Sequence, residues 1–180
     1  MSAGVETADP TSGQRWVFRQ TGGALLEADF FVSAGGYVRE HMHPSQEETF
    51  FGVSGRFVVD VDGERRTVGP GDTLVVPPRT PHGFHDAPED AHVVVQVRPA
   101  LRLDDYFRTF LGLSRDGRIR MPYTGRPYPL LQLAIVLDAY AAEVAIPHVP
   151  LALQRPALGA LAALGRAQGL PDSFPEYGVT

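Results

Sequence analysis

The first hundred residues consist of short apolar runs that are broken at regular intervals. Segments rich in valine, phenylalanine and threonine recur from Gln14 to Arg98, and glycine, proline or aspartate separates each run from the next. Runs of this length are typical of β-strands, and no helical stretch lies between them that could cross over to a parallel strand. The pair Asp62-Gly63 predicts a two-residue hairpin. The sequence therefore predicts an antiparallel β-sandwich or barrel.

The hydrophobic pattern changes in the second half, where apolar residues recur every three or four positions. This spacing predicts three helical stretches, at 103–113, 129–147 and 150–170. Pro129 suits a first helical position, and Pro156 should kink the last helix or restart it. Residues 114–128 are rich in glycine, proline and arginine and are predicted to form a loop.

The predicted organisation therefore has three parts. Residues 1–13 are expected to form a disordered lead-in, residues 14–100 the β-barrel, and residues 101–180 a helical C-terminal extension. Apolar residues at helical spacing are most often core, so packing against the barrel is the default expectation for the extension. The extension could also close the barrel mouth as a lid or build a homodimer interface.

The composition excludes several classes of function. Arginine accounts for all 16 basic residues, so lysine chemistry is absent, and the chain has no cysteine for disulfides or thiolate ligands. A net charge of -5 without a basic cluster argues against nucleic acid as a partner. The most apolar window, 129–147, is interrupted by Gln132, Asp138 and Glu143, which argues against a membrane span. These features predict a cytoplasmic protein.

The segment REHMHPSQEETF, residues 39–50, raises the question of a metal site. Residues two apart on a helix point about 200° apart, whereas on a strand they share one face and lie roughly 6.6 Å apart. His41 and His43 can therefore converge on one ion only from a strand. Tyr37 and Arg39 have the same parity and are predicted to share that face. Parity alone leaves open whether Glu47 or Glu48 joins the histidines.

A second segment, GPGDTLVVPPRTPHGFHD, presents His82 after a proline-rich turn. The two segments together resemble the paired motifs of the cupin superfamily. The first motif, G-x5-H-x-H-x3-4-E-x6-G, is matched from Gly35 to Gly55 and selects Glu48. The second, G-x5-P-x-G-x2-H-x3-N, is matched by Gly71, Pro77 and His82. It departs at Arg79, where glycine is usual, and at Asp86, where asparagine is usual.

The resemblance implies a double-stranded β-helix, or jelly-roll, barrel with a single divalent metal ion. The implied ligands are His41, His43, Glu48 and His82. Such a set suits Fe(II), which is the expected ion, as well as Mn, Ni, Co, Cu or Zn. Four protein ligands on an octahedral ion would leave two positions for water, dioxygen or substrate.

The residues around the implied site give weaker predictions. Phe50 and Phe84 share the parity of Glu48 and His82, so they are candidate pocket walls, and Gln96 is a candidate polar pocket residue. Arg39 and Tyr37 are candidate catalytic residues that could hold a substrate carboxylate or enolate. The alternatives are core packing for the phenylalanines, a solvent-facing position for Gln96, and an ion pair and a rim aromatic for Arg39 and Tyr37.

Three functions are compatible with such a site. The resemblance favours an oxygen-dependent dioxygenase or oxidoreductase that acts on a small enolic, carboxylated or aromatic substrate. The alternative is an isomerase, lyase or cyclase that uses the ion as a Lewis acid. A non-catalytic cupin that binds a small molecule is the third possibility.

Overall fold

The computed structural model describes residues 5–119 and 127–178. Its strands are β1 (Val5–Asp9), β2 (Gln14–Gln20), β3 (Leu26–Val32), β4 (Val38–His41), β5 (Glu47–Ser54), β6 (Phe57–Val61), β7 (Glu64–Val68), β8 (Thr73–Val76), β9 (His82–Phe84) and β10 (Ala91–Arg98). Its helices are α1 (Leu103–Arg115), α2 (Pro127–Ala139), α3 (Leu151–Ala167) and the short 3-10 helix η1 (Pro175–Tyr177).

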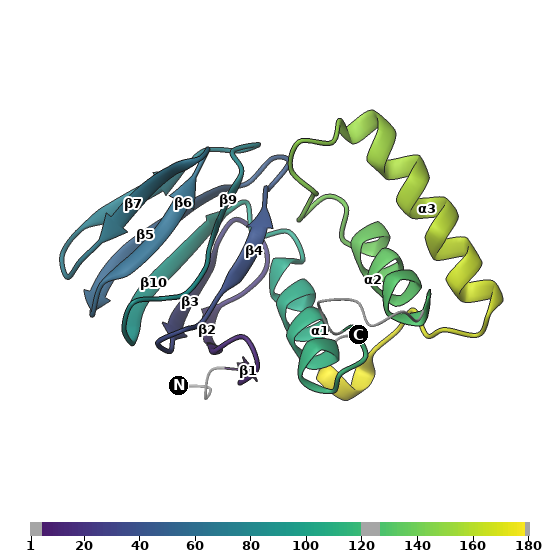
Figure 1. Cartoon of the computed structure of the whole chain (residues 1–180), viewed down its shortest axis with the longest axis horizontal. Coiled ribbons are helices and arrows are strands. Elements are labelled where there is room, and N and C mark those ends of the chain that lie inside the picture. The colour runs from purple at the N-terminus through teal and green to yellow at the C-terminus, as the bar shows by residue number, and fades with distance from the viewer. Residues whose placement is uncertain (1–4, 120–126, 179–180) are drawn as a thin grey trace.

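The strands form two antiparallel sheets, as the sequence predicts. One sheet has the order β1-β2-β3-β10-β5-β8 and the other the order β4-β9-β6-β7. The helices gather on one side of the β-structure, with α1 nearest the strands and α3 farthest from them (Figure 1). The fold is therefore a mainly β, antiparallel double-stranded β-helix followed by three C-terminal helices.

The core lies between the two sheets. Alternate residues of β3 and β10 are buried, as expected for strands with one face turned inward. Phe30 of β3 meets Phe57 of β6 edge to face, with ring centroids 6.0 Å apart. Trp16 of β2 stacks between Phe30 and Phe107 of α1, at centroid distances of 4.2 and 4.4 Å. The first helix thus packs against the barrel core, which is the default expectation for apolar residues at helical spacing.

The predicted hairpin is confirmed between β6 and β7. Their ladder closes on the pair Val61 and Glu64, leaving Asp62 and Gly63 as the two loop residues. Both adopt positive φ angles, 50° and 77°, as a two-residue hairpin of the primed type requires.

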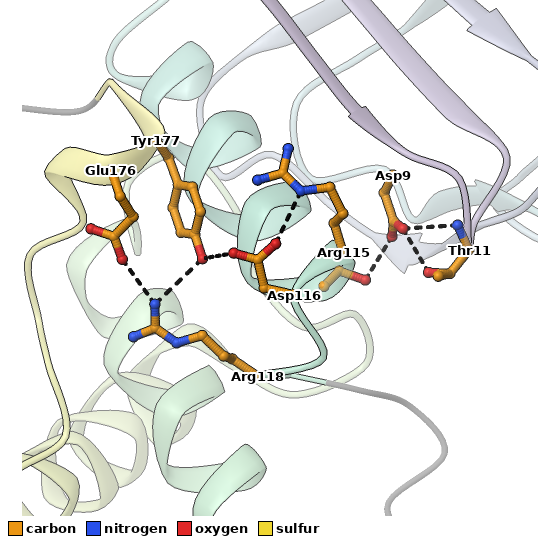
Figure 2. A network of polar contacts seen from close by, with 8 residues as sticks. Asp9, Thr11, Arg115, Asp116, Arg118, Glu176 and Tyr177 are labelled. Carbon is orange, nitrogen blue, oxygen red and sulfur yellow. Dashed lines mark hydrogen bonds and ion pairs between the residues drawn. The ribbon is translucent and has the colours of Figure 1, made fainter.

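The expected disorder of residues 1–13 is wrong for the part that the structure describes; residues 1–4 lie outside it. Residues 5–9 form β1, which pairs in register with β2. The strand ends at Asp9, whose fully buried carboxylate accepts hydrogen bonds from Thr11, Ser12 and Ser114 of α1. Figure 2 shows this carboxylate between the Thr11 turn and α1. These bonds give the segment the tertiary contacts that a disordered lead-in lacks.

The helices begin and end at residues that differ from the predicted ones. α1 continues through Arg115, and α2 begins at Pro127 rather than Pro129; residues 120–126 of the predicted loop lie outside the described chain. α2 stops at Ala139, well short of 147, because the next residues contact the barrel. α3 runs through Pro156 without restarting there. Among the described residues, no helix is long and apolar enough to cross a membrane.

The C-terminal segment is tied to the end of α1. Arg118 donates to Glu176 and to the Tyr177 hydroxyl, which in turn donates to Asp116 (Figure 2). The Tyr177 ring lies against Gly112, where an added Cβ would come within 2.6 Å of it. The last described residues therefore stabilise α1, the helix that packs on the barrel.

Candidate metal centre

Four side chains from three strands and one turn meet at one end of the barrel. His41 ends β4, Glu48 is the second residue of β5, and His82 begins β9, directly opposite His41 in the ladder. His43 lies just beyond β4. One potential ligand atom from each of the four lies within 4.8 Å of the other three. Glu48 is buried, whereas Glu47 is exposed.

The three imidazoles are oriented by backbone carbonyls. His41 Nδ1 lies 2.9 Å from the Arg39 oxygen, His43 Nδ1 2.7 Å from the Glu143 oxygen, and His82 Nδ1 2.9 Å from the Thr80 oxygen. A carbonyl oxygen only accepts, so each Nδ1 must carry the proton. The lone pair of each ring is consequently on Nε2, the arrangement that metal-ligating histidines commonly adopt.

Three of the four ligand atoms are buried and lack a hydrogen-bond partner among the described residues. They are Nε2 of His43, Oε2 of Glu48 and Nε2 of His82. The Glu48 oxygen lies 2.8 Å from the His82 nitrogen and 3.7 Å from the His43 nitrogen. Unpaired buried polar atoms are costly, and a cation would satisfy all three together. The residues present therefore fit a divalent metal ion.

The electrostatics of the cluster keep Glu48 and His41 in their metal-binding forms. Burial opposes ionisation of Glu48, but the adjacent His43 and His82 imidazoles outweigh it and lower the pKa of this carboxyl far below its usual range. Burial, followed by the repulsion of His82 and His43, lowers the pKa of His41 well below its ordinary value. Burial also lowers the pKa of His82, but Glu48 more than compensates and the net pKa is raised. An ionised carboxylate and a neutral His41 are the forms that bind metals.

Phe50 and Phe84 belong to the hydrophobic core. Both are buried, and each packs against Phe57, with ring centroids 5.3 and 5.2 Å apart. Core packing, the simpler alternative for both, accounts for these contacts.

The assignment of Gln96 to a pocket is wrong. Its amide donates to Glu27 at 2.6 Å, and its oxygen accepts from Arg98. The neighbours on either side in β10, Val95 and Val97, are completely buried. Because side chains alternate along a strand, Gln96 lies on the outer face of the sheet.

Tyr37 and Arg39 do not follow the alternation predicted for them. Val38 pairs with Phe84 and His41 with His82, so three steps along β4 correspond to two along β9. This irregularity breaks the parity between Arg39 and His41, and Arg39 is exposed. Tyr37, Arg39 and His41 nevertheless line one pocket, of about 160 Å³, between β4 and the helices.

The contact between the loop that carries His43 and the segment after α2 was not predicted from the sequence. Met42 forms an antiparallel bridge with Ala145, with N–H···O distances of 3.1 and 2.9 Å. The same segment supplies the Glu143 carbonyl that orients His43. The only sequence signal was Glu143 itself, an acidic residue in the most apolar window of the chain. Its side chain is 2 % exposed and accepts from the Arg102 amide.

The remaining histidines lie outside the cluster. His85 is exposed, as its parity relative to His82 predicts. His92 contacts Asp29 at 2.6 Å and stacks on Phe31, and His148 lies 3.2 Å from Glu40. The contacts of His92 and His148 are structural.

Comparison with known proteins agrees with this fold and site. Residues 29–97 match the family model described as Cupin domain. This stretch includes all four cluster residues: His41 on β4, Glu48 on β5, His82 on β9, and His43 between β4 and β5. The chain therefore contains a cupin domain with a His/Glu cluster that could bind a metal ion.

Individual relatives are distant. An uncharacterized protein of Methanocaldococcus jannaschii is 36% identical over 55 residues, which are 31% of this chain and 44% of that protein. Quercetin 2,3-dioxygenase of Bacillus subtilis is 29% identical over 101 residues, 56% of this chain and 29% of the enzyme. The matches thus span less than half of either relative. The solved structure of KdgF from Halomonas sp. is 26% identical with a TM-score of 0.47, covering 52% of this chain and 83% of that one.

Proposed function

We propose that this protein is a mononuclear metal-dependent cupin enzyme that acts on a small organic molecule. The observation that carries the proposal is the set of three buried ligand atoms without partners, together with three imidazoles whose Nδ1 atoms are held by carbonyls. Buried polar atoms are rarely left unpaired, so three of them within one His/Glu cluster favour a bound cation. The metal ligands in this proposal are His41, His43, Glu48 and His82.

The donor set suggests which ion occupies the site. Three imidazoles and one carboxylate suit borderline divalent ions and are poorly suited to Ca(II). Fe(II) is our proposal, with Mn, Ni, Co, Cu and Zn as alternatives. Because the chain has no cysteine, no thiolate can bias the site toward a softer metal.

The proposed reaction is an oxygen-dependent one, of the dioxygenase or oxidoreductase type. A distant relative named quercetin 2,3-dioxygenase supports this class without indicating the same substrate. When bound, the ion would supply either activation of dioxygen or, in the alternative isomerase, lyase or cyclase reaction, Lewis-acid stabilisation of an enolate. A non-catalytic binder is the third candidate, and homodimerisation stays a prediction.

The chain's own groups have separable tasks in this proposal. The carbonyls of Arg39, Glu143 and Thr80 hold a proton on each Nδ1, so every Nε2 remains available as a ligand. Burial of His43, Glu48 and His82 excludes water from three sides of the cluster. His41 is the half-buried member, so a small molecule would approach from its side.

Metal analysis of anaerobically purified protein, followed by oxygen uptake with enolic or catechol-like compounds, tests the proposal. Stoichiometric iron with substrate-dependent uptake is the expected result. Zinc with turnover in the absence of oxygen would support the Lewis-acid alternative instead, and binding without turnover under either condition would support the non-catalytic one.

The ligand assignment has its own test. His82→Ala should abolish stoichiometric metal binding while leaving the barrel folded, because it removes a ligand that is held by a single carbonyl bond. His85→Ala, three residues away and exposed, is the matched control and should keep full occupancy. Metal content by mass spectrometry and folding by circular dichroism decide the outcome. Undiminished occupancy in the His82 variant would show that the site is elsewhere.

A further inference from the structure

A pocket of about 160 Å³ lies between β4 and the helical extension. Residues 38–41 form one wall, and α1, α2 and the segment that follows α2 form the others. His41 belongs both to this pocket and to the candidate metal centre. The pocket is therefore the cavity that directly adjoins the metal cluster.

The wall made by β4 is polar because β4 is the edge strand of its sheet. An edge strand presents unpaired N–H and C=O groups on its outer side. At the two ends of that side the Tyr37 amide donates to the Ser12 carbonyl at 3.0 Å, and Met42 pairs with Ala145. Residues 38–41 line the pocket between these contacts, so their outward backbone groups could bind a polar ligand; the Arg39 carbonyl already accepts from His41.

The helices and the segment after α2 contribute mostly apolar residues, whereas Asp9, Ser12, Gln14 and Ser114 form a polar part of the lining. The apolar residues include Phe107 and Phe110 from α1, Leu133 and Leu137 from α2, and Val144. The volume is well below the roughly 300–1,000 Å³ of pockets that hold drug-sized ligands. A molecule with a single ring fits this space better than a fused or multi-ring compound does.

Acidic and basic groups both line the pocket, and the acidic ones have partners. The buried Asp9 carboxylate already accepts hydrogen bonds from Thr11, Ser12 and Ser114. Arg39 lines the pocket, and within the described ranges its guanidinium makes no ion pair. The other charged residue on this stretch of β4, Glu40, is engaged by His148 at 3.2 Å. Burial raises the pKa of Tyr106, so this pocket phenol stays neutral. A carboxylate or enolate at the polar wall would thus meet the Arg39 guanidinium.

We propose that this pocket binds the substrate, and that the substrate is a single-ring organic anion. Its ring would lie against α1 and α2, and its carboxylate or enolate would lie at Arg39 and the edge of β4, beside His41. The inference rests on the proposed metal-dependent function and adds the substrate class to it. In this arrangement the helical extension forms half of the substrate site.

Binding can be measured without turnover. The chain has one tryptophan, Trp16, which stacks on the pocket residue Phe107 at 4.4 Å, so its fluorescence should report occupation of the pocket. Zinc-loaded protein is titrated with benzoate and with benzamide, its uncharged analogue of the same shape, and calorimetry checks the affinities. We expect benzoate to bind and to change the fluorescence, and benzamide to bind more weakly.

Arg39→Gln tests the charge. It should weaken benzoate about five- to tenfold and leave benzamide unchanged, because only the anion gains from the guanidinium. Arg56→Gln removes another exposed arginine, from the turn between β5 and β6, and should change neither affinity. Equal effects of the two arginine variants on benzoate would contradict the proposed role of Arg39.

Leu137 tests the apolar wall. Leu137→Phe should reduce benzoate binding at least tenfold by filling the pocket, and Leu137→Ala should admit 2-naphthoate, which the parent protein excludes. A gain of naphthoate binding cannot result from misfolding, and Leu153→Phe, on the exposed side of α3, is the control for added bulk. If neither Leu137 variant changes ligand preference, the substrate binds elsewhere.

The outcomes separate this inference from the proposed function. Suppose that zinc occupancy is normal and that neither the parent nor any variant responds to benzoate. This result would contradict the proposed substrate pocket but not the proposed metal-dependent function. The opposite result is a protein that never retains metal but binds benzoate with an affinity that the Arg39 and Leu137 substitutions change. It would contradict the proposed metal-dependent function and still support a binding site for a single-ring anion.

Discussion

Arg79 occupies a backbone conformation that normally favours glycine. Its φ is 64°, at the position where the cupin motif has glycine. The turn is held by the Arg79 amide, which donates to the His43 carbonyl at 2.8 Å, and by its guanidinium Nε, which donates to the Pro44 carbonyl at 3.3 Å. The departure from the motif therefore leaves the turn in place and connects it to the loop that carries His43.

Substitution of Arg79 should show how far its side-chain hydrogen bond compensates for the left-handed backbone strain. Arg79→Ala keeps the left-handed strain and loses the side-chain bond, so it should reduce the free energy of unfolding by about 0.5–1 kcal/mol. Arg79→Gly relieves about 1–2 kcal/mol of strain, which offsets the lost bond and the greater flexibility of the unfolded chain, so it should stay within about 0.5 kcal/mol of the parent. Urea denaturation measures both. An alanine variant more stable than the glycine variant would contradict this account.

Asp29 gives a prediction for pH. Burial raises the pKa of Asp29, but Arg19 and His92 outweigh it, so the net pKa lies below the ordinary value of 3.8. A lowered carboxyl pKa stabilises the fold above the unfolded-state pKa, and this contribution is lost as the pH falls through the folded-state pKa. Asp29→Asn should therefore cost about 1 kcal/mol at pH 7 and progressively less below about pH 4.

Denaturation at several pH values checks this prediction for Asp29. Asp60→Asn is the control, because Asp60 also accepts from an arginine, Arg65, but at an exposed position. Its effect should be small throughout. A constant Asp29→Asn penalty down to pH 2 would show that charge is not the cause.

At the level of elements, the segment after α2 contacts the candidate metal centre. Residues 140–145 leave the helix so that Ala145 can pair with Met42 and the Glu143 carbonyl can accept from His43. Orientation of a ligating imidazole through its other nitrogen commonly changes metal affinity by about 10–100-fold. The helical extension is therefore expected to contribute to metal affinity.

Ala145→Pro tests this contribution. The substitution removes the N–H that donates to the Met42 carbonyl at 2.9 Å and should weaken metal binding about tenfold or more. Ala145→Gly keeps this N–H and is the matched control, with a smaller expected effect. Competition with a chromophoric chelator measures both affinities. Equal affinities in the proline variant and the parent would show that the segment does not support the site.

At the scale of the whole molecule, the proposed ion would connect the barrel to the extension. A ligand that binds only the folded state stabilises it by about 2.7 kcal/mol at a free concentration of 100 times its dissociation constant. Zinc should therefore raise the melting temperature and chelation should lower it. Because His43 is hydrogen-bonded to the extension, zinc should also slow amide exchange at Met42 and Ala145.

In the same exchange experiment, the amides of α3 serve as the internal control. Amides in the middle of α3, which packs mainly on α2, should gain less protection locally than Met42 and Ala145 do. Uniform changes along the chain would mean that zinc acts only through global stability. The His82→Ala variant should show no zinc response.

The sequence by itself determined the parts of this protein that depend on local pattern. Short alternating strands, the Asp62-Gly63 hairpin and the shared strand face of His41 and His43 were predictable, because strand period and turn chemistry are encoded within a few residues. The addition of His82 to this pair came from the cupin resemblance. The selection of Glu48 over Glu47 needed the cupin resemblance as well.

The tertiary structure alone decided the features that depend on distant contacts. β1 is ordered because Asp9 meets Ser114, and α2 ends early because residues 140–145 dock beside His43. The register shift in β4, which moves Arg39 out of step with His41, arises from pairing with β9. Each outcome is set by partners about 40 to 105 positions away, which a local periodicity cannot specify. Local pattern thus predicts the strand that carries His41 and the nearby His43, whereas the pocket beside the proposed metal ligands exists only in the folded molecule.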